Sequence, residues 1–343
     1  MPKTFTGRFF EDYAIGETIR HSVPRTVSGG ERALYHALYP SRHAIYSSDE
    51  FARSCGLPKS PIDDIAAFHL VFGKTVPDVS LNALANLGYA EGRWMRPVYE
   101  GDTLEAVSEV IGLKQNSNGK SGVVWVTTTG FNQHAEKVIK YCRWVMVRKR
   151  DMEAPAPPPV LPELKPALDA DDIVVPEGLD FSQYDFGRAG EPHRWGDYEI
   201  GETIDHVDRV TVEEAEHMMA TRLWQNTARV HFDGTRREDG KRLIYGGHVI
   251  SMARALSFNG LANAQMIAGL NGGAHANPCF AGDTICSWSE VIDKAETGAP
   301  GVGAIRLRLV AAKGGPQFVL KDDNGRYLPD ILLDIDYWAL MPI

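Results

Sequence analysis

The sequence predicts an α+β protein built from two tandem copies of one domain, each an antiparallel sheet packed against an apolar helix. Residues 12–21, DYAIGETIRH, return at 197–206 as DYEIGETIDH, with eight of ten positions identical at an offset of 185. PVYEGDTL at 97–104 returns at 278–285 as PCFAGDTI. Strand-like segments follow in both halves. Separated blocks that repeat in the same order indicate duplication of a whole domain.

Each copy is expected to contain the same order of elements. A short polar segment precedes a helix, which is GGERALYHALY in the first copy and VEEAEHMMATRLW in the second. A variable loop and a more apolar helix follow, from IDDIAAFHLVFGKTV and YGGHVISMARALSFNGLA. The last part is β-rich: GVVWVTTTGFNQ, VIKYCRWVMVRK, AIRLRLVAAK and ILLDIDYWALM show the period-two alternation of antiparallel strands. DDNG at 322–325 predicts a hairpin turn.

The two copies are separated by a proline-rich segment, EAPAPPPVLPELKPALDADD. Prolines donate no backbone hydrogen bond and hold the chain extended, so this segment is expected to be a semi-rigid linker. The predicted boundaries are an N-terminal domain at 1–152, a linker with an irregular arm at 153–190, and a C-terminal domain at 191–343.

The composition excludes several classes of protein. A formal net charge of −9 argues against nucleic acid or an anionic membrane as the main partner. The four cysteines form no CxxC pair and are expected to be reduced thiols. The first twenty residues lack the apolar core of a signal peptide and no apolar run reaches transmembrane length, so a cytoplasmic location is expected. The histidines form no HxH or HExxH pair, so no metal site is predicted.

Several stretches carry a resemblance to a known family. The Gly-Asp-Thr block after a proline in each half, NQHAEKV at 132–138 and RLIYGGHVIS at 242–251 resemble the hotdog fold of the MaoC-like enoyl-CoA hydratases, in the double-hotdog form. The chain length, PSRHAIYSSDEF and WQNTARVHFD at 224–233 are most similar to the mesaconyl-CoA hydratases, also called β-methylmalyl-CoA dehydratases.

This resemblance implies a hydro-lyase that converts β-methylmalyl-CoA reversibly to mesaconyl-CoA and water. The implied setting is bacterial acetate assimilation through the ethylmalonyl-CoA pathway. The resemblance implies no cofactor, since CoA is part of the substrate, and a homodimeric assembly.

The same resemblance identifies candidate catalytic residues in the second copy. His231 falls on the family's catalytic histidine and Asp233 on its trailing aspartate, whereas Asn226 replaces the catalytic aspartate. Asn226 can hold water by hydrogen bonds but has no ionisable carboxyl group, so proton transfer is expected to fall on His231. The equivalent positions of the first copy are Ser41 and Tyr46, which predicts that this copy is catalytically degenerate.

Hydration of an unsaturated thioester develops negative charge on the thioester oxygen, which backbone amides at a helix N-terminus can stabilise. Gly246 and Gly247, at the start of an apolar helix, are the predicted donors, with Gly247 preferred. The matching stretch of the first copy contains Asp63 and Asp64, whose charges would repel an enolate.

The free carboxylate of mesaconyl-CoA requires a cationic partner, preferably arginine. Arg229 inside the motif is the first candidate, and the others are Arg222, Arg42 and Arg254. The alternative for each of these arginines is a solvated charge on the surface with no role in binding.

Three other functions stay open on the sequence. An acyl-CoA thioesterase would need a carboxylate aimed at the carbonyl, for which Asp63 and Asp64 are the candidates. An (R)-specific enoyl-CoA hydratase would act on another acyl chain. A non-catalytic acyl-CoA-binding protein would bind thioesters without turnover.

Overall fold

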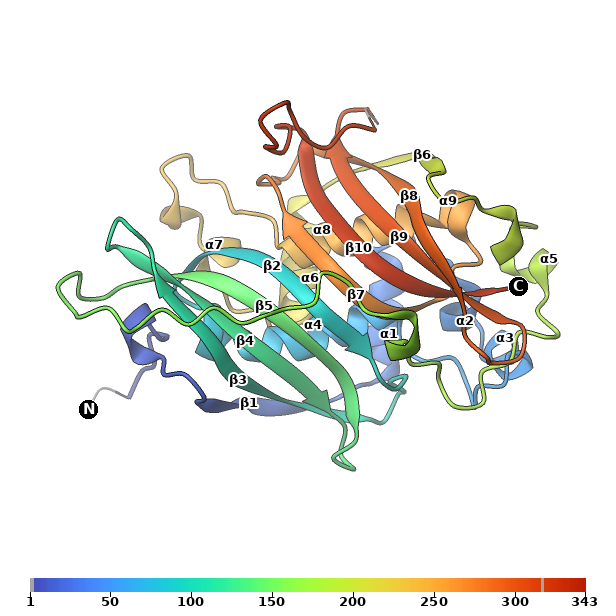
Figure 1. The fold of residues 1–343 in the computed structure, drawn as a ribbon, viewed down its shortest axis with the longest axis horizontal. Helices are drawn as coiled ribbons and strands as arrows, with labels where there is room; N and C mark the ends of the chain where they lie inside the picture. The colour runs from blue at the N-terminus through green and yellow to red at the C-terminus, as the bar shows by residue number, and fades with distance from the viewer. Residues whose placement is uncertain (1–2, 316–317) are drawn as a thin grey trace.

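The computed structural model describes residues 3–315 and 318–343. Its strands form one antiparallel sheet in the order β1-β3-β4-β5-β2-β7-β10-β9-β8-β6 (Figure 1). The strands of the first copy are β1 (Thr18–Thr26), β2 (Ala83–Trp94), β3 (Thr103–Gln115), β4 (Ser121–Phe131) and β5 (Lys137–Arg148). Those of the second are β6 (Thr203–Thr211), β7 (Met266–His275), β8 (Thr284–Glu296), β9 (Val302–Lys313) and β10 (Ile331–Pro342).

The strand order reads the same from both edges when each strand is replaced by its counterpart in the other copy. The copies meet where β2 pairs with β7 in antiparallel register, with Tyr89 opposite Gly273 and Arg93 opposite Gly269. The duplication predicted from the sequence is therefore a two-fold arrangement of five-stranded half-sheets.

Two apolar helices lie against the same face of this sheet, α4 (Asp64–Thr75) and α8 (Gly246–Leu256) (Figure 1). Every residue of α4 is buried, and so is every residue of α8 after Gly246. One large apolar cluster contains residues of both helices and of both half-sheets. The predicted α+β double-hotdog architecture is confirmed, and its core is shared between the copies.

The other helices of the described residues are α1 (Gly29–Leu38), α2 (Ala44–Ser47), α3 (Asp49–Ser54), α5 (Phe186–Ala189), α6 (Glu214–Leu223), α7 (Arg229–Phe232) and α9 (Phe258–Leu261), with one-turn segments η1 (Phe10–Asp12), η2 (Val76–Ser80), η3 (Ala170–Asp172), η4 (Trp195–Asp197) and η5 (Gly234–Arg236). Among them, α1 and α6 are nearly as long as α8, and the rest are short. The four helical stretches expected from the sequence are all present. The last one ends at Leu256, earlier than expected, because Asn259 and Gly260 leave helical geometry.

The repeated sequence blocks make the same contacts in both copies. The Val27 amide donates to the Asp102 carbonyl at 2.8 Å, and the Val212 amide donates to the Asp283 carbonyl at 2.9 Å. The glycine before each aspartate has a positive φ, 100° and 91°, which glycine adopts without steric cost. The Gly-Asp-Thr blocks are therefore turns that join the start of each copy to its sheet.

The segment between the copies crosses the outer face of the sheet (Figure 1). Val160 forms a bridge with Leu113 of β3, and the Leu168 amide donates to the Asn271 side chain at 2.8 Å. The predicted boundaries at 152 and 190 stay a prediction. The predicted DDNG turn is present, since the Gly325 amide donates to the Asp322 carbonyl at 2.9 Å.

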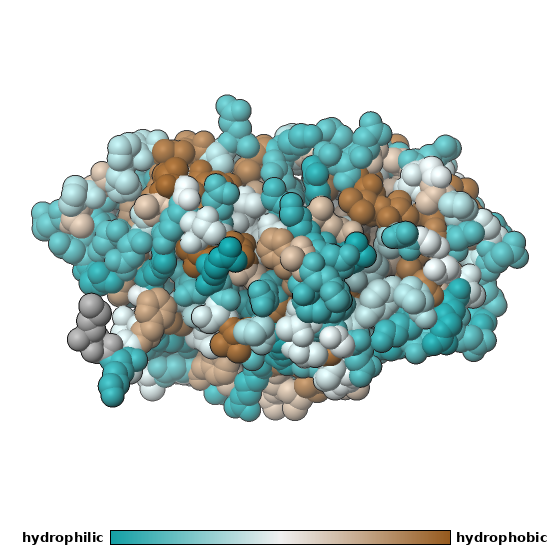
Figure 2. All heavy atoms as spheres, turned by 90° about the horizontal axis from the view of Figure 1, so that it is seen from below, coloured by the Kyte–Doolittle hydropathy of each residue, from teal (hydrophilic) through white to brown (hydrophobic). Residues whose placement is uncertain are grey.

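One face of the molecule is mainly hydrophilic, with apolar side chains in separate small patches (Figure 2). Within 3–315 and 318–343, no helix has the length and apolar character that crossing a membrane requires.

Candidate active site

A cavity of about 370 Å³ lies between the two copies, within the size range of small-molecule sites. Its polar lining comes from both halves of the chain: Asn226, His231, His275 and Asn277 from the second copy, and Ser80, Asn86, Tyr89 and Arg143 from the first. Neither copy alone forms this cavity.

The loop that carries Asn226 is held in place by its own backbone. Gln225 adopts a left-handed conformation with φ of 55° after the end of α6, and the Asn226 amide donates to the Thr221 carbonyl at 3.1 Å. The Asn226 Oδ1 accepts from the Ala228 amide at 3.0 Å. The Oδ1 is therefore engaged within the loop, and the Nδ2 of this buried side chain remains as a donor at the cavity wall.

His231 lies on α7 with its ring buried at the cavity wall. Its Nδ1 is 2.7 Å from the Leu243 carbonyl oxygen, which can only accept, so Nδ1 carries the proton. Nε2 therefore has a free lone pair. Burial lowers the pKa of His231 to about 4, although the hydrogen bond to Leu243 acts in the opposite direction. The ring is neutral near pH 7 and available as a general base.

The helix α8 begins at Gly246, and the backbone amides at its start are the predicted donors to the thioester oxygen. Tyr245 precedes the helix without capping it through its side chain. Among the described residues, neither the Gly246 amide nor the Gly247 amide has a hydrogen-bond acceptor. Gly246 lines the cavity, whereas a Cβ at Gly247 would meet the rings of Tyr245 and His69. The predicted preference for Gly247 over Gly246 stays a prediction.

His275 and Tyr89 are part of the cavity wall that the sequence did not indicate. The Tyr89 hydroxyl and His275 Nε2 are 3.0 Å apart, on strands that pair across the two copies. Burial lowers the pKa of His275 to about 4, and the nearby His231 acts in the same direction. A Cβ at Gly246 would come within 2.4 Å of the His275 ring, so a larger residue there would require this ring to move.

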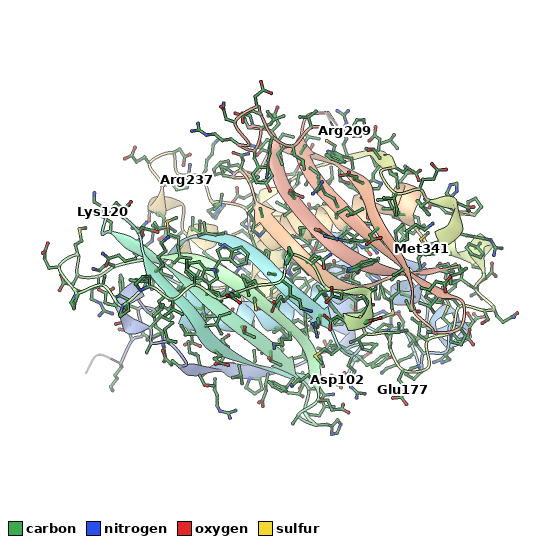
Figure 3. The ribbon with its side chains drawn as sticks, in the orientation of Figure 1. Asp102, Lys120, Glu177, Arg209, Arg237 and Met341 are labelled. Atoms are coloured by element: carbon green, nitrogen blue, oxygen red, sulfur yellow. The ribbon has the colours of Figure 1, made fainter. Side chains whose placement is uncertain are left out.

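Asp233 and Arg229 do not line the cavity, although both flank His231 closely in sequence. The Asp233 carboxylate accepts from the Thr235 amide and hydroxyl and from Arg236 Nε at 3.0 Å. Figure 3 places Arg237, further along this segment, at the periphery of the molecule. Asp233 therefore braces an outer loop.

The Arg229 guanidinium donates to Asn82 Oδ1 at 3.1 Å and to the Thr6 carbonyl at 3.0 Å. It holds the N-terminal segment rather than facing the cavity. The other sequence candidates lie elsewhere too: Arg222 is exposed, Arg42 stacks on Phe258, and Arg254 donates to Ser257 and to the Ala264 carbonyl. Arg143, on the first copy's β5, is the arginine that lines the cavity, and it was not among the candidates predicted from the sequence.

The equivalent positions of the first copy form a closed polar network. The Tyr46 hydroxyl donates to Asp64 Oδ2 at 2.5 Å, and the Ile267 amide donates to the same oxygen at 2.7 Å. The Ser41 hydroxyl donates to Asp63 Oδ2 at 3.3 Å. Burial raises the pKa of Asp64 to about 7. These carboxyl groups are engaged inside the core and do not line the cavity, so neither of the carboxylates proposed for a thioesterase lies at this site.

The fold and the site together define a double-hotdog protein of the MaoC-like type. A crystal structure from Chloroflexus aurantiacus, described as a MaoC domain protein dehydratase, matches with a TM-score of 0.97 and 55% identity, over 100% of this chain and 99% of that chain. A conserved hypothetical protein of Mycobacterium tuberculosis with a double hotdog fold matches with a TM-score of 0.73 and 23% identity, over 98% of both chains. The latter similarity concerns the fold alone.

The chain belongs to the mesaconyl-CoA hydratase family, whose model matches residues 3–319. It is 73% identical over 341 residues to a mesaconyl-CoA hydratase of Cereibacter sphaeroides, covering 99% of each chain. It is 56% identical over 346 residues to a β-methylmalyl-CoA dehydratase of Chloroflexus aurantiacus, covering 99% of this chain and 98% of the relative. The family resemblance predicted from the sequence is confirmed.

Proposed function

We propose that this protein hydrates mesaconyl-CoA reversibly to β-methylmalyl-CoA. The observation that carries the proposal is His231, whose Nδ1 proton is fixed by Leu243 so that the Nε2 lone pair is free at the cavity. The names of the two relatives and the family model support the choice of substrate.

In the hydration direction, His231 Nε2 takes a proton from water as the water oxygen bonds to C3 of the enoyl chain. The electron pair of the double bond moves toward the thioester and leaves an enolate oxygen. The free amides at the start of α8, from Gly246 and Gly247, would bind that oxygen in a preorganised site. The proton on His231 then passes to C2, so that the elements of water have been added and the imidazole is neutral again. Dehydration follows the same steps in reverse.

Asn226 positions the water in this proposal. Because its Oδ1 accepts from Ala228, its Nδ2 donates to the water oxygen, or to the hydroxyl that leaves in the reverse direction. Asn226 exchanges no proton, and His231 is therefore the group that carries the proton in both directions.

The test is to mix the purified protein with mesaconyl-CoA while following the enoyl-thioester absorbance and free thiol. Loss of absorbance without thiol is the expected result. All four cysteines are buried in the folded protein, so a thiol reagent would report released CoA. Thiol release would support the thioesterase alternative. If neither signal changes while crotonyl-CoA is hydrated, the protein is a hydratase for another acyl chain. If neither substrate reacts, the non-catalytic alternative stands.

The proposed reaction uses an acyl-CoA thioester and no cofactor besides the CoA of that substrate. We also propose that the protein forms a homodimer and that it is located in the cytoplasm. Light scattering on the purified protein tests the former, and cell fractionation tests the latter.

A further inference from the structure

Arg143 is a buried cation that has no counter-ion among the described residues. Its relative exposure is 0%, and within the described part of the chain no carboxylate forms an ion pair with it. Burial lowers its pKa, and the groups with the largest opposing effects are tyrosines. Guanidinium groups keep their charge in proteins, so this site holds a desolvated positive charge. An unpaired buried charge is costly, and such charges are normally paired in the functional state.

The hydrogen-bonding groups around Arg143 are only partly satisfied. One terminal nitrogen donates to Thr75 Oγ1 at 2.7 Å, and Ser80 Oγ lies 3.5 Å from both terminal nitrogens. Its Nε is buried and has no acceptor among the described residues. On the neighbouring strand β2, both polar atoms of the Asn86 side chain are buried and also lack partners there. Of the five N–H donors of the guanidinium, one makes a short hydrogen bond, two make only long contacts with Ser80, and the Nε donor has no partner in the described residues.

These groups lie in the same cavity as the candidate catalytic residues. Arg143, Asn86 and Ser80 line it together with His231 and Gly246. The Arg143 guanidinium packs over the Phe72 ring at 4.3 Å, which holds it against one wall. The first copy therefore contributes a positive charge to the cavity, and the second copy contributes the histidine proposed to transfer the proton.

We propose that Arg143, assisted by the Asn86 amide, binds the free carboxylate of the acyl-CoA substrate. The inference rests on the proposed function, because it assigns the distal carboxylate of that substrate. A carboxylate offers two acceptor oxygens to the two-pronged guanidinium and would supply the missing counter-ion. Asn86 Nδ2 supplies a further donor.

The strand pairing is consistent with a short dicarboxylic acyl chain. Arg143 lies directly opposite Tyr89 in the β2–β5 ladder. The Tyr89 hydroxyl contacts His275, whose ring in turn lies against Gly246. Three bonds separate the thioester carbon from the carboxylate carbon of mesaconyl-CoA. An anion held at Arg143 and a thioester oxygen held at the Gly246 amide would place the intervening double bond inside the cavity that His231 also lines.

This assignment gives the degenerate first copy a role in recognition. Its Ser41 and Tyr46 are committed to the closed network around Asp63 and Asp64. Its β5 nevertheless supplies Arg143 to the site formed by the second copy. The copy that lacks the histidine would then determine which acyl group is accepted.

The experiment compares, by calorimetry, the binding of two saturated thioesters, which have no double bond to hydrate. Succinyl-CoA carries a distal carboxylate, and butyryl-CoA has a methyl group in its place. The variants are Arg143→Met, which keeps the apolar stem, and Arg143→Lys, which keeps the charge but loses the two-pronged geometry. Arg148→Met is the matched control, since Arg148 lies on the same strand with its side chain exposed.

We expect the wild type to prefer succinyl-CoA by roughly 100-fold, in line with a desolvated charge pair. Arg143→Met should reduce this preference to about threefold or less while changing the butyryl-CoA affinity by less than about threefold. Arg143→Lys should retain an intermediate preference, and Arg148→Met the full one. The melting temperature of ligand-free Arg143→Met should not fall, because the substitution removes a buried charge that has no counter-ion.

Three results would overturn the assignment. One is a wild type without preference for the carboxylate, and another is a preference that survives in Arg143→Met and Arg143→Lys. The third is an equal loss of both affinities in Arg143→Met with a lowered melting temperature, which marks a structural residue. Arg229→Met tests the candidate predicted from the sequence. If this variant loses the preference for succinyl-CoA and Arg143→Met keeps it, Arg229 is the carboxylate-binding residue.

Failure of the proposed function gives a different pattern. If mesaconyl-CoA is not hydrated but the preference for succinyl-CoA depends on Arg143, the carboxylate subsite stands and the reaction is wrong. If mesaconyl-CoA is hydrated and the preference for succinyl-CoA does not depend on Arg143, the reaction stands and the assignment of the carboxylate subsite is wrong. If the wild type binds neither thioester and hydrates nothing, both are wrong.

Discussion

Replacing Gly73 by alanine should damage the active site although Gly73 belongs to the other copy. A Cβ at this position of α4 would lie 1.8 Å from the Trp224 carbonyl oxygen. Since Cβ atoms in proteins almost never come closer than 3.0 Å to another atom, the two backbones would have to separate by at least about 1.2 Å. Trp224 precedes Gln225 and Asn226, so the shift displaces the loop that holds the proposed water.

The size of the effect follows from two opposing contributions. In an unobstructed helix, alanine in place of glycine would stabilise the fold by about 1 kcal/mol. Forcing a methyl group into a filled contact costs about 1–3 kcal/mol, so the free energy of unfolding should stay unchanged or fall. A displacement of about 1 Å in an active site costs roughly 100-fold in activity, and kcat/KM for mesaconyl-CoA should drop accordingly.

The assay is kcat/KM from enoyl-thioester absorbance, paired with thermal unfolding. Gly272→Ala is the matched control, because no atom lies within 4 Å of a Cβ built at Gly272. That variant should keep its activity within about threefold of the wild type. If Gly73→Ala instead raises the melting temperature and keeps wild-type kcat/KM, the close contact with Trp224 does not position the site.

Three further predictions concern the second copy. His231 must be neutral to act as a base, and burial lowers its pKa to about 4, so kcat/KM should remain nearly constant from pH 8 to pH 5.5. A base with the pKa of an ordinary histidine would retain roughly one-tenth of its kcat/KM at pH 5.5. A tenfold fall by pH 5.5 with an intact circular dichroism spectrum would contradict the prediction. Gly246→Ala should lower kcat/KM by roughly 100-fold, because its Cβ displaces the His275 ring, and activity within threefold of Gly272→Ala would argue against that packing. Asp233→Ala should change kcat/KM by less than about threefold, since its carboxylate braces an outer loop; a loss comparable to that of His231 variants would return Asp233 to the catalytic group.

Much of the fold could be predicted because its signals are local. The alternation in VIKYCRWVMVRK and ILLDIDYWALM identifies strands, and the offset of 185 identifies two copies. The pairing of β2 with β7 joins the copies into one sheet and could not be predicted in the same way. Periodicity shows which face of a strand is buried but does not identify its neighbour.

The candidate site was predictable only where a motif fixed it. Asn226 and His231 lie at the cavity, as the resemblance to the family motif implied. Arg229 and Asp233 lie two residues on either side of His231, and positions two apart in a helical turn face different directions. Neighbours in sequence were therefore poor candidates for neighbours in the site.

A signal for Arg143 was present in the sequence. In YCRWV, residues 141–145, strand alternation puts Arg143 on the same face as Tyr141 and Val145. All three side chains are buried. A charged residue at an inward-facing strand position is unusual and marks a site where a ligand can supply its partner. Which cavity it faces could not be inferred, because that depends on the packing of one copy against the other.

The most direct test of His231 as the general base is the His231→Asn variant. The asparagine amide can replace Nδ1 as donor to the Leu243 carbonyl but provides no basic nitrogen in place of Nε2. If His231 is the general base, kcat for mesaconyl-CoA falls about 100-fold to 10,000-fold, while the unfolding temperature and the affinity for succinyl-CoA stay close to wild type. A folded His231→Asn protein that hydrates mesaconyl-CoA within tenfold of the wild-type rate would contradict this role.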